Sequence, residues 1–116
     1  MSLCLFAAGK IVALGSAAFT LAWTHSVEKT VWEEDWRLTP AGLAIVQARV
    51  KGSGAGMEPP DTAHYDGTWW RYTPTVAPLA ELRLDDSGIT SPWTIRAGKR
   101  THTTHAGATS VIAACP

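Results

Sequence analysis

The fold is decided by the stretch from Phe19 to Val50, which reads FTLAWTHSVEKTVWEEDWRLTPAGLAIVQARV. Two short connections, residues 27–30 and residues 39–42, divide it into three runs rich in aromatic and β-branched residues. Side chains of a strand alternate between the two faces of a sheet, so every second residue of such a run shares a face. The stretch therefore predicts a three-stranded antiparallel meander.

The two connections set the expected pairing of the three strands. Four-residue loops are common in hairpins, and Pro40 followed by Gly42 is a turn signal because proline fixes φ and glycine accepts positive φ. Pairing outward from both loops places four rows of side chains on one face: Phe19, Leu38 and Leu43; Leu21, Trp36 and Ile45; Trp23, Glu34 and Gln47; His25, Trp32 and Arg49. An apolar half of the face is thus predicted to run into a polar cluster.

The polar end of this face is the candidate site. A carboxylate between Trp32 and Trp36 is costly to bury unless it is paired, so Arg49 is the expected partner of Glu34, with Gln47 beside them. Two interpretations stay open. The cluster is either a structural network at the rim of a β core, or a surface that binds a ligand or partner.

Composition bounds the protein class. With 116 residues, 46% of them hydrophobic and 17% charged, the chain is expected to form one globular β domain over residues 1–116. Ten basic residues balance ten acidic ones without a basic stripe, which argues against nucleic-acid binding. The sequence offers no catalytic triad, metal-ligand spacing or nucleotide loop, so we expect no enzyme activity, no metal and no cofactor.

The rest of the chain also favours strands. Turn signals recur about every ten residues, and no segment has helical periodicity. Further strands are expected over residues 3–8, 11–15, 68–73, 81–84, 93–97, 100–104 and 110–114. The predicted fold class is all-β, a small antiparallel β-sandwich or partly open barrel built from meander hairpins. Trp69 and Trp70 should point to opposite sides, into a two-sided core or toward a partner.

The ends of the chain carry its two cysteines, Cys4 and Cys115. They form a disulfide in an oxidising compartment or stay buried free thiols in the cytoplasm, and the sequence leaves both open. Residues 3–23 are largely apolar, but Lys10 and a turn at Gly9-Lys10 favour two short strands. A membrane anchor or an export signal remains an alternative, although no clear signal peptide is present.

Two motifs carry a family resemblance. The run from Phe19 to Trp36 and the segment GSGAGMEPP at residues 52–60 resemble the bacterial domain-of-unknown-function family 1850 over nearly the whole chain. The hallmark positions are His25, Ser26, Val27, Glu28, Gly54, Ala55, Gly56 and Met57, and the resemblance attaches no catalytic duty to them. Arg96 and Arg100 stand where some members carry a cysteine pair.

The resemblance implies a companion of tripartite ATP-independent periplasmic (TRAP) transporters that have a fused permease and a TAXI-type solute receptor. The expected function is then a non-enzymatic accessory protein at the cell envelope or periplasmic side, in contact with the membrane only indirectly. The expected contact surface contains His25, Ser26, Glu28, Trp32, Gly54, Gly56 and Met57. The alternative is a small-ligand or metal-binding module with its pocket at the His25, Trp32, Glu34 and Arg49 end of the meander.

Overall fold

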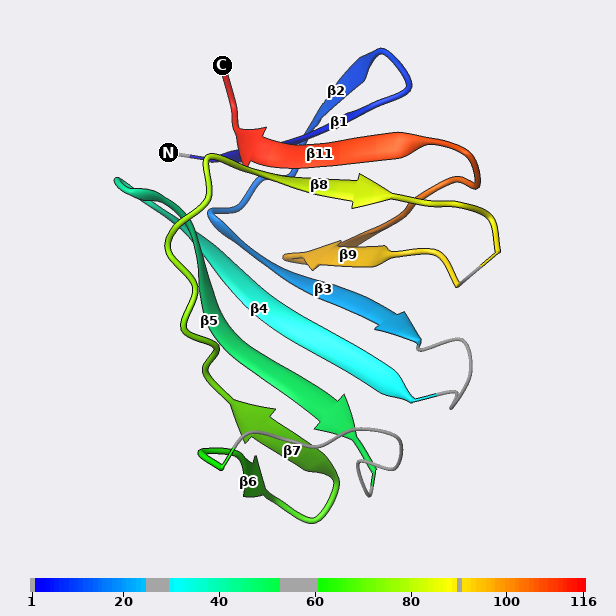
Figure 1. The fold of residues 1–116 in the computed structure, drawn as a ribbon. Coiled ribbons are helices and arrows are strands. Elements are labelled where there is room, and N and C mark those ends of the chain that lie inside the picture. Colours follow the sequence, from blue (N-terminus) through cyan, green and yellow to red (C-terminus); the bar gives the residue numbers. More distant parts are fainter. Residues whose placement is uncertain (1, 25–29, 53–60, 90) are drawn as a thin grey trace.

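The computed structural model describes residues 2–24, 30–52, 61–89 and 91–116, and the structural statements below concern those residues. They form strands and connections without a helix (Figure 1). The strands are β1 (Leu3–Ala7), β2 (Lys10–Ala13), β3 (Ala18–Thr24), β4 (Val31–Thr39), β5 (Gly42–Lys51), β6 (His64–Tyr65), β7 (Trp69–Tyr72), β8 (Glu81–Asp85), β9 (Thr94–Ala97), β10 (Arg100–Thr103) and β11 (Thr109–Ala114).

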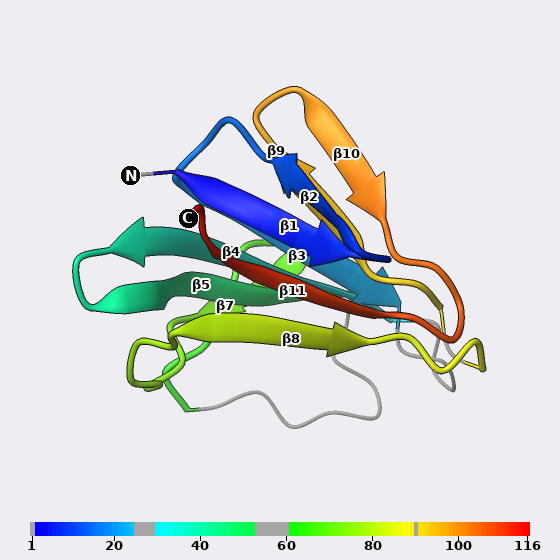
Figure 2. The same cartoon turned by 90° about the horizontal axis from the view of Figure 1, so that it is seen from above.

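The strands build two antiparallel sheets that pack against each other. The smaller sheet has the order β2-β1-β11-β8, and the larger has the order β10-β9-β3-β4-β5-β7-β6. Figure 2 shows the smaller sheet lying across part of the larger one. The expected all-β sandwich is confirmed, and the larger sheet does not close into a barrel.

The core lies between the facing sides of the two sheets. Alternation puts Leu3 and Leu5 of β1 on the same side as Ile112 of β11, and all three are buried. The larger sheet contributes its own alternating set. The buried core cluster consists of Leu3, Leu5, Leu14, Phe19, Leu21, Trp36, Leu38, Leu43, Leu84, Ile95, Ala97 and Ile112.

Most of the expected strands outside the meander are present with small shifts at their ends. The N-terminal hairpin turns at Ala8-Gly9, one residue earlier than expected, because Ala7 pairs with Lys10. The late hairpin turns around Gly98 as predicted. Residues 64–65 were not among the expected strands, but they form β6, because Tyr65 pairs with Trp70 and their rings lie 5.0 Å apart.

The register predicted for the first hairpin is wrong by two residues. Trp23 lies opposite Trp32, where their rings stack 5.9 Å apart, and Leu21 lies opposite Glu34. A two-residue shift leaves every side chain on its predicted face, because alternation has a period of two. The shared apolar face of β3 and β4 is therefore as expected, although the individual partners are not.

The register of the second hairpin holds only near its turn. Leu38 pairs with Leu43 and Trp36 with Ile45 as predicted, and then Val46 is inserted as a β-bulge. From there Gln47 lies opposite Asp35 instead of Glu34. A bulge of one residue turns the following side chains to the other face.

The bulge moves Arg49 to the outer face, opposite Glu33, so the predicted neighbourhood of Arg49 with Glu34 and Trp32 is wrong. Ala48 and Val50 take the inner positions, and each is only 1% exposed. Burial of these two apolar side chains, together with pairing of the guanidinium on the other face, is a physical reason for the bulge.

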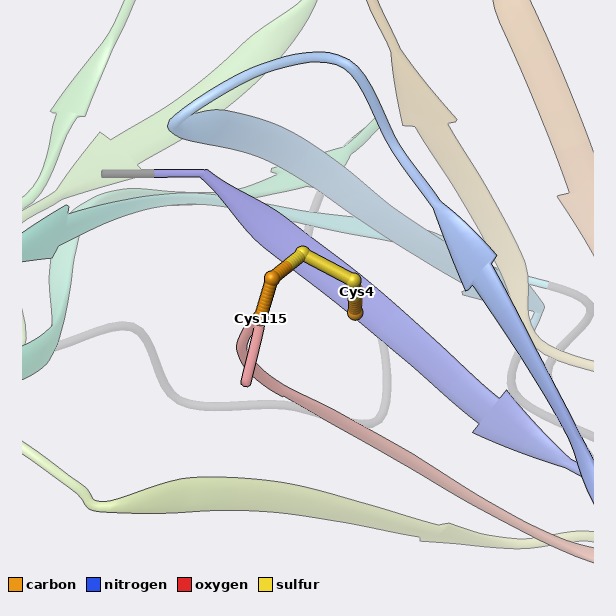
Figure 3. The surroundings of a disulfide bond; sticks show 2 residues. All are labelled: Cys4 and Cys115. Carbon is orange, nitrogen blue, oxygen red and sulfur yellow. A yellow bond between two sulfur atoms is a disulfide. The ribbon is translucent and has the colours of Figure 1, made fainter.

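A disulfide joins Cys4 in β1 to Cys115, the residue after β11, with a Cα–Cα distance of 4.9 Å (Figure 3). Beside it, the Cys115 amide donates a 2.9 Å hydrogen bond to the Ser2 carbonyl. The structure thus corresponds to the oxidised alternative for the two cysteines.

The apolar N-terminal stretch runs through β1, β2 and most of β3, with Lys10 at the start of β2. In the described residues, no helix has the length and apolar character that a membrane span requires.

Candidate functional site

The structure divides the predicted site residues between two faces of the larger sheet. Trp32 and Glu34 lie on the inner face, whereas Gln47 and Arg49 lie on the outer face. No single pocket formed by the described residues can therefore contain both Glu34 and Arg49. Six predicted positions lie outside the described residues: His25, Ser26, Glu28, Gly54, Gly56 and Met57.

Arg49 is the centre of a network on the outer face. Its Nε donates to Glu33 Oε1 at 2.8 Å, and its Nη1 donates to Asp35 Oδ2 at 2.8 Å. The side chains of Arg49 and Glu33 are each only 12% exposed, while that of Asp35 is 37% exposed. Such charge-assisted bonds from a planar guanidinium fix geometry as well as charge.

Three neighbouring strands extend this network. From β9, Arg96 Nη2 donates to Glu33 Oε2 at 2.9 Å, and from β3, Thr20 Oγ1 donates to Asp35 Oδ1 at 2.7 Å. From β7, Arg71 donates to Gln47 Oε1 at 2.8 Å and to Asp66 Oδ2 at 2.6 Å. We call the set Thr20, Glu33, Asp35, Gln47, Arg49, Asp66, Arg71 and Arg96 the outer ionic cluster. Its three arginines balance its three carboxylates.

Trp69 borders the outer ionic cluster. The Arg49 guanidinium carbon lies 5.7 Å from the ring centroid of Trp69, and Lys51 Nζ lies 5.9 Å from it, both within range of a cation–π interaction. Trp70 faces the other side of the sheet, where it packs against Tyr65. The Trp69-Trp70 pair thus places one ring among the outer charges and the other toward the interior.

The two carboxylates paired with Arg49 are held in their ionised form. Burial acts to raise the pKa of Glu33, but hydrogen bonds from Arg96 and Arg49 and their positive charges outweigh it, so this pKa lies below its ordinary value. Burial also opposes ionisation of Asp35, but the bonds from Arg49 and Thr20 lower its pKa. Both carboxylates therefore stabilise the folded state above their ordinary pKa, and this contribution is lost as the pH falls through the lowered values.

We expect Arg49→Met to lower the free energy of unfolding by about 3 kcal/mol, because the half-buried carboxylates of Glu33 and Asp35 lose their central partner. Urea denaturation measures this change. Arg37→Met is a matched control, because Arg37 is exposed on the same face of β4 and should change stability by less than about 0.5 kcal/mol. Equal effects of the two substitutions would contradict the central role of Arg49.

Glu34 lies on the opposite face, in a less polar setting. It stands between Leu21 and Ala48 in the sheet, and the Trp36 indole Nε1 donates to Glu34 Oε1 at 3.0 Å. Burial raises the pKa of Glu34, and this hydrogen bond offsets only part of the effect. Burial and the nearby charge of Glu34 also raise the pKa of Tyr72.

The raised pKa of Glu34 gives a testable pH dependence. The folded state holds this proton more firmly than the unfolded chain, so its contribution to stability falls as the pH rises above the ordinary value of 4.5. Glu34→Gln keeps an acceptor for Trp36 and removes the charge. We expect it to raise the melting temperature at about pH 7 but not at about pH 3. A lower melting temperature at neutral pH would show that the charge itself is stabilising.

The described residues do not assemble a metal site from three or more histidine, cysteine, aspartate or glutamate side chains. The expected alternative, a metal-binding module at the His25, Trp32, Glu34 and Arg49 end of the meander, includes His25, which lies outside the described part of the chain. Of the other histidines, His64 is in β6, His102 is in β10 and His105 follows β10.

Sequence reasoning missed most of the outer ionic cluster. The signal was the acidic run at residues 33–35, in which either Glu34 or its two neighbours could face Arg49. A bulge decides between these options, and nothing in the local sequence marks Val46 as the inserted residue. The roles of Arg71 and Arg96 depend on strands far away in the sequence.

Comparison with known proteins identifies one family. A family model described as "Domain of unknown function (DUF1850)" matches residues 19–103. No curated protein matches the chain, and no solved structure matches it. The matched span contains every member of the outer ionic cluster, whereas Cys4 and Cys115 lie outside it.

Proposed function

The chain belongs to the domain-of-unknown-function family 1850, and from this membership we propose that it is a non-enzymatic accessory protein of a TAXI-type TRAP solute uptake system. In this proposal it acts through protein–protein contact with the permease or the solute receptor. The link to a TRAP system rests on the resemblance of the motifs at residues 19–36 and 52–60.

The observation that supports a contact role is the composition and order of the outer face. Arginine and tryptophan are enriched at protein interfaces, and the outer ionic cluster brings Arg49, Arg71 and Arg96 together with Trp69 beside them. Arg49 is largely buried and fixes the cluster, while the side chain of Arg96 is 45% exposed. A partner would therefore meet charges that are already held in place, which lowers the entropic cost of binding.

The disulfide supports a location outside the reducing cytoplasm. Disulfides persist in oxidising compartments such as the bacterial periplasm. The proposed contact is therefore with the solute receptor or with a periplasmic part of the permease, and the protein meets the membrane only through that partner.

Co-purification tests the proposal. We expect the tagged protein to retain the receptor or the permease when all three are co-expressed. Trp69→Ala should weaken this association at least about tenfold, because interface tryptophans are frequent hot spots. Ile89→Ala is the control, because Ile89 is 90% exposed and lies outside the outer ionic cluster.

Two further measurements complete the test. Solute uptake by cells should fall with Trp69→Ala in step with the loss of association, whereas the melting temperature should change by no more than a few degrees. If neither transporter component co-purifies with the unaltered protein, or if Trp69→Ala binds as well as the unaltered protein, the proposal is wrong.

A further inference from the structure

A cavity opens on one side of the sandwich, between edge strand β2 of the smaller sheet and edge strand β10 of the larger sheet. Figure 2 shows the β9–β10 hairpin beside β2 on this side. The cavity has a volume of about 430 Å³, which is within the size range of small-molecule sites. It is separate from the outer ionic cluster, none of whose members lines it.

The register explains why polar side chains face this cavity. Lys10 pairs with Ala7 and lies on the same face as Leu5 and Val12, so this lysine points toward the interior side of an edge strand. His102 pairs with Ile95, a fully buried core residue, and therefore also faces the interior. The walls combine an apolar part with these two groups, with a third nitrogen-bearing side chain, His105, and with the hydroxyl side chains of threonines 101, 103 and 104 and Ser110.

Two polar side chains that line the cavity, Lys10 and His102, have no partner among the described residues, whereas the Thr104 hydroxyl donates to Asp86 Oδ2 at 2.8 Å. His102 Nε2 is buried and has no hydrogen-bond partner among those residues. None of the ion pairs among the described residues involves Lys10, and no aspartate or glutamate is among the described residues that line the cavity. The unpartnered His102 Nε2 is costly because it is buried, whereas Lys10 is exposed at the cavity mouth. Nitrogen-bearing groups in a lining without a carboxylate fit an anionic ligand group.

We propose that this cavity binds a small aliphatic monocarboxylic acid. The carboxylate bonds the Lys10 ammonium and the His102 imidazole, and the hydrocarbon chain lies along Leu5, Ala7 and Val12. The His102 ring can bring a nitrogen toward the ligand by rotation about its Cβ–Cγ bond, a torsion with broad minima. The site is independent of the partner contact proposed above.

A competing explanation exists for Lys10. Inward-pointing charges on edge strands protect sheets from pairing with other chains. This explanation predicts self-association when the charge is removed, and it gives no role to the unpaired His102 nitrogen. The experiment therefore includes a measurement of oligomeric state.

Calorimetric titration of the protein with octanoate tests the site. We expect saturable binding of one octanoate per chain, with much weaker binding of acetate, which lacks the chain, and of octanol, which lacks the charge. Lys10→Met retains the length of the stem and should weaken octanoate binding at least about tenfold, whereas Lys10→Arg should retain most of it. Lys99→Met is the matched control, because Lys99 is exposed in the neighbouring turn and does not line the cavity.

Several outcomes would overturn the proposal. Octanoate could fail to bind at millimolar concentration, or bind equally to the Lys10→Met protein. Self-association of Lys10→Met without any octanoate binding by the unaltered protein would establish the edge-protection role instead. His102→Leu gives a second check, because it should weaken binding of octanoate more than that of octanol. The melting temperature of each variant shows that it is folded.

Discussion

Reduction of the Cys4–Cys115 bond should lower the free energy of unfolding by about 4 kcal/mol. The two cysteines are 111 positions apart, so the bond restricts nearly the whole unfolded chain. Closure of a loop of this size lowers the conformational entropy of the unfolded state, and the bond joins β1 to the end of β11. A domain with a typical stability of about 5–15 kcal/mol would lose a large fraction of it.

Urea denaturation with and without a phosphine reductant measures this effect, and a Cys4→Ala/Cys115→Ala protein provides the control. The double variant should be destabilised to a similar degree, and the reductant should then leave its midpoint unchanged. If the reductant shifts the urea midpoint of both proteins equally, it acts through something other than the disulfide bond. A change below about 0.5 kcal/mol in the unaltered protein would show that the two ends already stay close together in the unfolded chain.

Substitution of Gly42 by alanine should also cost about 4 kcal/mol. Gly42 has a φ of +124°, and a Cβ atom there would lie 2.6 Å from the Leu79 carbonyl oxygen. That oxygen accepts a 2.7 Å hydrogen bond from the Leu43 amide, and the Leu79 amide donates a 2.9 Å bond in return. Alanine would add backbone strain and push away the segment that precedes β8.

Gly67→Ala separates the cost of backbone strain from the cost of the close contact with Leu79. Gly67 has a φ of +99°, but a Cβ atom there would meet no atom within 4 Å. It should therefore show only the conformational cost of roughly 1–2 kcal/mol. Thermal denaturation of both variants measures the difference, which reports on the contact with Leu79. If both variants lose the same stability, the segment at Leu79 moves away from the new Cβ atom without a measurable free-energy cost.

The two faces of the larger sheet differ in how well the sequence predicted them. The inner face of β3 and β4 was predicted, because Phe19, Leu21 and Trp36 alternate with polar residues and must be buried together. Even the two-residue error in the first hairpin left this face intact. The outer face depended on the bulge at Val46 and on strands distant in sequence, so its network could not be read from local spacing.

The candidate site was likewise predicted only in part from the sequence. Arg49 was correctly expected to pair with a carboxylate, because a partly buried carboxylate needs a cationic partner, but the acid chosen was the wrong member of residues 33–35. The cavity beside Lys10 was not expected, since its two walls come from β2 and β10, far apart in the chain.

By itself the sequence determined the fold class, most of the strands and the inner face of β3 and β4, because alternation and turn chemistry are local properties of the chain. Tertiary structure decided which acids pair with Arg49, which edges of the sandwich stay open, and that Cys4 lies beside Cys115. These features depend on the relative placement of distant strands, and a single inserted residue reverses the face on which a side chain lies.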